Sequence, residues 1–132
     1  MSRNPKFLSR LPSPVLSVGT HQLAGRGRSG NSWVSPKGCL QFSLRLRVTF
    51  AELPPARLVF IQYLFALAVV EACRDSSVLG PRGDRIRVKW PNDVYVVGGR
   101  DIAKTTKVAG ILVYTAFEGS AVDIIIGASH QA

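Results

Sequence analysis

Acidic residues are scarce in this chain, and the first of them, Glu52, comes only after eight basic residues. The 132 residues include 17 Lys and Arg against eight Asp and Glu, which gives a formal net charge of +9. Such an excess indicates an anionic partner, because net charge reports on partners and solubility rather than on fold. Nucleic acid, a membrane surface and a phosphorylated small molecule all fit that description, and the charge alone does not choose among them.

Cysteine and histidine are also few. Cys39 and Cys73 are far apart, and the two histidines, His21 and His130, lie near opposite ends of the sequence. Without paired Cys or Cys–His spacing, the sequence predicts neither a metal site nor a disulfide framework. Residues 1–14 lack the apolar stretch of a secretory signal, although their Arg, their Ser and their lack of acids faintly resemble a transit peptide. We expect a reducing, cytoplasmic location.

The composition is that of a globular domain. Apolar residues make up 46% of the chain and charged residues only 19%, unlike the charge-rich composition of disordered chains. A length of 132 residues is typical of one domain, so residues 1–132 are interpreted as a single domain.

Several segments have the patterns of β-strands. Val15–Val18 is a short apolar run, and Cys39–Val48 alternates apolar with polar residues, as a half-buried strand does. Between them, His21–Ser32 is rich in Gly and Arg and is predicted to be a loop. After residue 85 the expected strands, separated by short turns that favour antiparallel pairing, are Arg85–Trp90, Val94–Val97, Lys107–Tyr114 and Val122–Ile126.

Ala56–Asp75 is too long for a strand and follows two prolines, which the first turn of a helix tolerates. Apolar residues occur on all sides of this predicted helix, so we expect it to be deeply packed. Its charged and polar residues leave too short an apolar run to cross a membrane; they are Arg57, Gln62, Glu71 and Arg74. The expected fold class is α+β, a mainly antiparallel sheet covered by helices.

The glycine-rich segment GRGRSGNSW, residues 25–33, formally contains the dinucleotide-binding pattern G-x-G-x-x-G. That pattern binds a dinucleotide only where a helix follows it, and residues 31–38 are rich in turn formers instead. The dinucleotide-binding interpretation is therefore rejected. Two interpretations remain. The loop binds an anion, with Arg26 and Arg28 projecting to one side, or it is a solvated basic turn with Trp33 in the core.

Two further segments combine turns or strands with a lysine. KWPND, residues 89–93, is an ordinary turn by its Pro-Asn-Asp, yet the flanking Lys89 and Trp90 are less expected there. KVAGIL begins with Lys107, and its Gly110 permits the close approach of a ligand. A snorkelling surface lysine is the plainer interpretation of Lys107.

Taken in order, GRGRSGNSW, KWPND and KVAGIL resemble the catalytic domain of biotin–protein ligases, and the long segment between the first two looks most like a fungal member. The resemblance covers residues 16–127. It implies the fold shared with class II aminoacyl-tRNA synthetases, with biotin and MgATP as substrates. Biotin is activated as biotinyl-AMP and passed to a lysine on the biotin carboxyl carrier domain of a biotin-dependent carboxylase.

The resemblance also assigns roles to residues. It implies catalytic roles for Lys107, Arg28 and Asp93. For biotin it implies Thr20, Gln22, Gly25, Arg26, Lys107 and Gly110, and for ATP or the adenylate it implies Arg26, Gly27, Arg28, Trp33, Lys89, Asn92 and Asp93. Asn92 and Asp93 are expected beside the adenylate or its Mg²⁺, and no protein-held metal is expected.

The resemblance breaks near both ends. A Ser-Thr turn that binds the ureido ring of biotin in the family has no counterpart, and the family pattern Gly-x-Gly-x-Asn stands here as residues 127–131, GASHQ. We therefore interpret the chain as a partial catalytic domain and expect weak or no ligase activity from it alone.

The alternative from another class is a small basic nucleic-acid-binding protein, with steep salt dependence and no response to biotin.

Overall fold

The computed structural model describes residues 5–99 and 102–130. Its centre is a six-stranded sheet in the order β1-β4-β8-β7-β6-β5, in which every neighbouring pair is antiparallel. The strands are β1 (Val15–Gly19), β4 (Gln41–Thr49), β5 (Ile86–Lys89), β6 (Asp93–Val96), β7 (Thr106–Glu118) and β8 (Ala121–His130). All six strand segments expected in the sequence are present, and the expected α+β fold with a mainly antiparallel sheet is confirmed.

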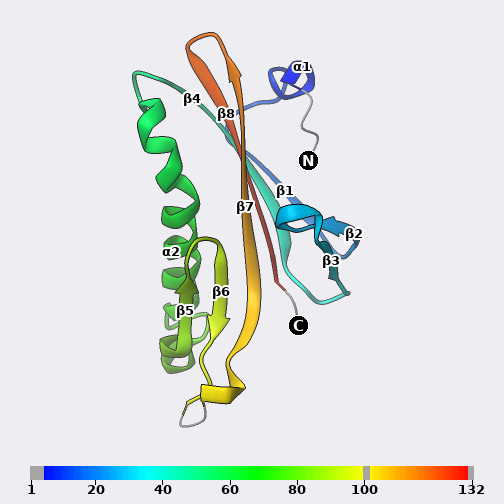
Figure 1. The fold of residues 1–132 in the computed structure, drawn as a ribbon, viewed down its shortest axis with the longest axis vertical. Helices are drawn as coiled ribbons and strands as arrows, with labels where there is room; N and C mark the ends of the chain where they lie inside the picture. The colour runs from blue at the N-terminus through cyan, green and yellow to red at the C-terminus, as the bar shows by residue number, and fades with distance from the viewer. Residues whose placement is uncertain (1–4, 100–101, 131–132) are drawn as a thin grey trace.

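One face of the sheet is covered by a long helix, while a small hairpin and the N-terminal segment lie on the other face (Figure 1). The helical segment begins as a 3₁₀ helix, η2 (Pro55–Phe60), and continues as α2 (Ile61–Arg74). The helix predicted over Ala56–Asp75 is thereby confirmed, and its first turn contains the expected proline. Shorter elements are α1 (Pro5–Leu8), η3 (Gly80–Arg85) and η4 (Ile102–Lys104).

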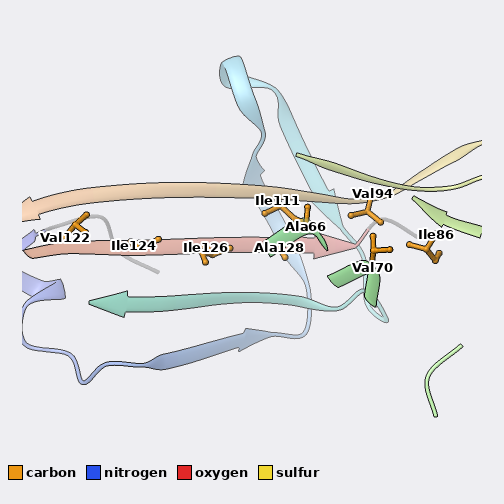
Figure 2. Packing of buried hydrophobic residues seen from close by; sticks show 9 residues of the cluster. All are labelled: Ala66, Val70, Ile86, Val94, Ile111, Val122, Ile124, Ile126 and Ala128. Carbon is orange, nitrogen blue, oxygen red and sulfur yellow. The ribbon is translucent and has the colours of Figure 1, made fainter. Parts of the chain in front are cut away.

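The hydrophobic core lies between α2 and the sheet (Figure 2). Ala66 and Val70 from the inner face of α2 are buried with residues from four strands, namely Ile86, Val94, Ile111, Val122, Ile124, Ile126 and Ala128. Alternate residues of β4 pack against this cluster and are partly buried, as the alternation predicts; they are Phe42, Leu44, Leu46 and Val48. Burying apolar area in this way is the main favourable term in folding.

The outer face of the helical segment is exposed, so the prediction of deep packing is wrong. Val59 is 75% exposed and Leu64 is 57% exposed, and only Ala66 and Val70 of α2 are buried. The helix rests on a single sheet face, and no described residue covers its far side. Against the expectation from its charged and polar residues, Pro55–Arg74 is long and apolar enough to cross a membrane by length and composition alone, and 11% of its apolar 18-residue window is buried.

The predicted loop over His21–Ser32 is a hairpin instead. β2 (Gln22–Arg26) pairs antiparallel with β3 (Ser32–Ser35), and η1 (Arg28–Gly30) forms the connection. Backbone pairing rather than burial holds the hairpin together, because Leu23 is largely exposed. The segment has no apolar alternation, so its periodicity does not predict a strand. No helix follows Gly30, which agrees with the rejection of the dinucleotide-binding pattern.

The polar face of β4 is also not a solvent face. Arg45 is fully buried and pairs with the buried carboxylate of Asp123, while its Nη1 donates hydrogen bonds of 2.8 Å to the carbonyls of Leu11 and Pro12. Arg47 bridges Asp123 and Glu118 at 3.1 and 2.7 Å. The alternation in the sequence locates the two faces correctly, but it does not indicate that the N-terminal segment covers the polar one.

Candidate anion-binding site

A cavity of ≈ 1140 Å³ lies on the sheet face opposite α2, between the sheet and the β2–β3 hairpin. The floor comes from β1, β4, β7 and β8, and the wall comes from the hairpin and the start of β6. Its charged lining residues are Arg26, Arg28, Asp93 and Lys107. With three cations against one carboxylate, the cavity is suited to an anionic ligand.

The glycine-rich loop makes a tight turn between β2 and β3. Gly27 N donates to Asn31 O at 2.6 Å, and Asn31 N donates to Arg28 O at 3.1 Å. Ser29 and Gly30 have φ of 57° and 79°, and this left-handed region is the reason a glycine suits the turn. Arg26 and Arg28 both line the cavity, and the guanidinium group of Arg28 contacts another lining residue, Asn92.

Lys107 reaches the cavity because of a register shift in β7. Val94 pairs with Ala109, but the next residue, Tyr95, pairs with Lys107, so one residue of β7 is left over. A bulge of this kind changes which side chains face which side of a sheet. Without it Lys107 would share the core face of Ala109, whereas with it Nζ lies 2.7 Å from Oδ1 of Asp93.

Trp33 and Gly110 surround the same ammonium group. Lys107 Nζ lies 5.0 Å from the centroid of the Trp33 ring, within the range of a cation–π contact. The indole Nε1 of Trp33 donates to Oγ of the buried Ser35 at 3.0 Å, which fixes the ring. A side chain at Gly110 would stand 3.8 Å from Trp33 Cη2 and from Lys107 Nζ, in the space that a ligand needs.

Arg28 contacts the turn that precedes β6. Its Nη1 donates to Oδ1 of the buried Asn92 at 3.1 Å. The backbone of Asn92 is itself held, because Ile111 N donates to Asn92 O at 2.8 Å. The three sequence segments therefore meet: Arg28 from the first contacts the second, and Asp93 from the second pairs with Lys107 from the third.

Most of the residues singled out in the sequence come together here. Those that line the cavity are Gln22, Arg26, Gly27, Arg28, Trp33, Asn92, Asp93, Lys107 and Gly110. Gly25 stands behind the lining, as a buried residue of β2. Thr20 and Lys89 are exposed outside the lining: the Thr20 hydroxyl lies 3.2 Å from His21 Nδ1, and Lys89 Nζ stands 5.2 Å from the centroid of the Tyr95 ring. Thr20 stands between two lining residues, Gly19 and His21, and Lys89 comes three residues before the lining residue Asn92.

The sequence reasoning missed part of the cavity floor. The missed lining residues include Ser17, His21, Gln41, Ser43, Gly127 and Ser129. Gln41 and Ser43 belong to the polar face of the Cys39–Val48 alternation, and that alternation predicts a half-buried strand without indicating a cavity on its polar side. Gly127 opens the incomplete Gly-x-Gly-x-Asn pattern, which by itself does not place it in a cavity.

Gly25 is required by close packing rather than by its φ angle. A Cβ added there would lie 2.6 Å from the carbonyl oxygen of Trp33, its partner on β3. We expect Gly25→Ala to destabilise the fold by about 1–3 kcal/mol, the usual range for forcing in a methyl group. Urea unfolding measures this, with Gly99→Ala as control because none of the described residues beyond its chain neighbours comes within 4 Å of a Cβ at that position. Equal stability of the two variants would contradict the close contact.

The sequence also matches known proteins. A model of the biotin/lipoate A/B protein ligase family matches residues 3–130. The chain is 34% identical over 132 residues to a biotin–protein ligase of Schizosaccharomyces pombe, covering 96% of this chain and 21% of that protein. It is 37% identical over 132 residues to the bifunctional ligase/repressor BirA of Escherichia coli, covering 96% of this chain and 36% of that protein.

Solved structures of similar proteins carry ligands. The biotin protein ligase of Leishmania major in complex with biotinyl-5-AMP has a TM-score of 0.60 and 25% identity, over 86% of this chain and 46% of that one. The enzyme of Aquifex aeolicus in complex with biotin and ATP has a TM-score of 0.58 and 28% identity, over 87% and 41%. The chain spans less than half the length of each of these four proteins.

Proposed function

The chain belongs to the biotin/lipoate A/B protein ligase family, and we propose that its cavity binds biotin and ATP and joins them as biotinyl-AMP. The observation that carries this proposal is the convergence of Arg28, Asp93 and Lys107 from three separate sequence segments on one cavity. The names of the similar proteins favour biotin over lipoate as the acid. The alternative, a small basic nucleic-acid-binding protein, finds no support in the family assignment.

The first step of the proposed reaction joins two anions. A carboxylate oxygen of biotin attacks the α-phosphorus of ATP, the bond from that phosphorus to the bridging oxygen breaks, and pyrophosphate leaves. Carboxylate and triphosphate repel each other, so the site has to neutralise both before they meet. Cations held in place beforehand also stabilise the charge that develops on the phosphoryl oxygens in the transition state.

The proposed roles follow from where the charges stand. Lys107 contacts the biotin carboxylate and the α-phosphate oxygens, because its ammonium group lies at the meeting point of Asp93, Trp33 and Gly110. Arg28 binds phosphate, and Asn92 holds its guanidinium group in place through the hydrogen bond of 3.1 Å. Trp33 offers an aromatic face to the adenine, and Arg26 and Gly27 shape the loop.

Mg²⁺ is proposed to enter with the triphosphate rather than to occupy a protein cage. Among residues 5–99 and 102–130, Asp93 is the one carboxylate in the cavity lining, and its Oδ1 already faces Lys107. Among the described residues there is no group of three His, Cys, Asp or Glu that could hold a metal ion. Asp93 and Asn92 would be the protein groups beside the ion, and phosphate and water oxygens would supply its other ligands, as is usual for Mg²⁺.

In the second step, the amine of an acceptor lysine attacks the acyl carbon of biotinyl-AMP, an amide bond forms and AMP leaves. The proposed acceptor is the biotin carboxyl carrier domain of a biotin-dependent carboxylase; one similar protein, from Paracoccus denitrificans, is named biotin–[acetyl-CoA-carboxylase] ligase. The cytoplasm is the proposed location.

Arg28→Ala tests the phosphate role. We expect the affinity for a non-hydrolysable ATP analogue to fall by about 10- to 100-fold, since a charged hydrogen bond contributes roughly 1.5–3 kcal/mol. Biotin affinity should change little. Calorimetric titration of each ligand measures both, and Arg82→Ala is the matched control because it removes the same charge from an exposed position outside the cavity. Equal losses in the two variants would point to overall charge instead.

A further inference from the structure

A straight row of residues crosses the cavity floor. Register partners on five adjacent strands are Gly19, Gln41, Ser129, Gly110 and Asp93. Gln41 stands three strand spacings from Asp93, which is about 14 Å. The row therefore joins the charged end of the cavity, where Lys107 meets Asp93, to a neutral amide at the other end.

The side chains in the middle of this row are small or absent. Gly19 has no heavy atom within 4 Å of the position that a Cβ would take, and Ser129 and Gly110 also carry small or no side chains. In the next row, Ser43 on β4 is the partner of Gly127 on β8, so the side chains are small on these two strands, and the row continues to Leu112 on β7. A narrow ligand can lie flat on the sheet here with one end at Lys107 and the other at Gln41.

The side-chain amide of Gln41 has a buried donor without a hydrogen-bond partner among the described residues. Its side chain lines the cavity, the residue is only 7% exposed, and its Nε2 is buried with no hydrogen-bond partner in the described part of the chain. A buried polar group without a partner is costly, and native proteins seldom keep one without a reason. The terminal torsion of glutamine is soft, so rotating the amide toward the cavity costs little.

We propose that Gln41 is a substrate-binding residue that donates a hydrogen bond to the neutral end of the acid, which for biotin is the ureido oxygen. This assignment rests on the proposed function, because it takes biotin as the acid and Lys107 as the group that holds its carboxylate. The valeryl chain then lies over Gly110 and Ser129, and the ring system ends at Gln41. The ureido oxygen is a strong acceptor, and the amide nitrogen of Gln41 supplies the matching donor.

The experiment is a thermodynamic cycle of two proteins and two ligands. Calorimetry measures the affinity of the wild-type chain and of Gln41→Leu for biotin and for lipoate, which has the same valeryl chain but a dithiolane ring without a ureido group. With biotin we expect Gln41→Leu to bind about tenfold more weakly. With lipoate the loss should vanish, because its ring offers no ureido oxygen to accept a hydrogen bond from Gln41. Gln41→Met provides a second variant of similar length.

Each result decides a different claim. If the wild-type chain binds biotin and both Gln41 variants match it, the assignment of Gln41 is wrong and the proposed function stands. Equal losses for biotin and lipoate would make Gln41 a structural residue, which also overturns the assignment. If the folded wild-type chain binds no biotin, the proposed function fails and the assignment fails with it. Urea unfolding shows that each variant is folded.

Discussion

Replacing Lys107 with Met is expected to slow the formation of biotinyl-AMP by about 100- to 1000-fold, the usual effect of removing one preorganised donor to a developing charge. The ammonium group lies 2.7 Å from Asp93 and 5.0 Å from the Trp33 centroid, so it is held before any substrate arrives. Methionine keeps most of the length and volume of the lysine stem but has no charge. Single-turnover assays with the protein in excess over labelled ATP measure the rate.

The matched control for Lys107 is Lys37→Met. Lys37 is exposed and outside the cavity lining, so its loss removes one charge from the protein without touching the site. We expect this variant to form biotinyl-AMP at the wild-type rate. A Lys107→Met variant that is as fast as Lys37→Met would show that the ammonium group does not act on the reacting atoms.

Arg45→Met is expected to lower the free energy of unfolding by about 3–5 kcal/mol, because it leaves a buried carboxylate without its main partner. Arg45 is fully buried and Asp123 is 2% exposed. The substitution also frees the carbonyls of Leu11 and Pro12, which loosens the N-terminal segment. Urea unfolding measures the loss, and Arg57→Met, at an exposed position, is the control.

A double variant separates the pairing from packing at this position. In Arg45→Met/Asp123→Leu neither charge is left buried and unpaired, so much of the lost stability should return. If the double variant is less stable than Arg45→Met alone, the loss comes from packing and from the freed carbonyls, and the account of the ion pair is wrong.

The secondary structure could be predicted where periodicity and burial agree. The alternation of residues 39–48 located β4 within two residues, and the length of Ala56–Asp75 located the helix. Burial was harder to predict, because an apolar residue such as Val59 does not reveal whether anything packs against it. Strand pairing without apolar alternation, as in the β2–β3 hairpin, leaves no periodic signal at all.

The candidate site could be predicted only in part. Three motifs in order identified Arg28, Asp93 and Lys107, and the structure brings all three to one cavity. The bulge that turns Lys107 toward Asp93 depends on the pairing between β6 and β7, which the sequence does not state. Gln41 was missed for a similar reason: its polar character is visible in the sequence, but the hairpin that makes its face a cavity floor is not.

The central claim is that this cavity is a biotinyl-adenylate site, and calorimetry with a non-hydrolysable biotinyl-adenylate analogue tests it most directly. The wild-type chain is expected to bind one equivalent, with affinity lowered by Arg28→Ala and by Lys107→Met but unchanged by Arg82→Ala. A folded wild-type chain that gives no binding signal, or binding that all three substitutions leave unchanged, would contradict the claim.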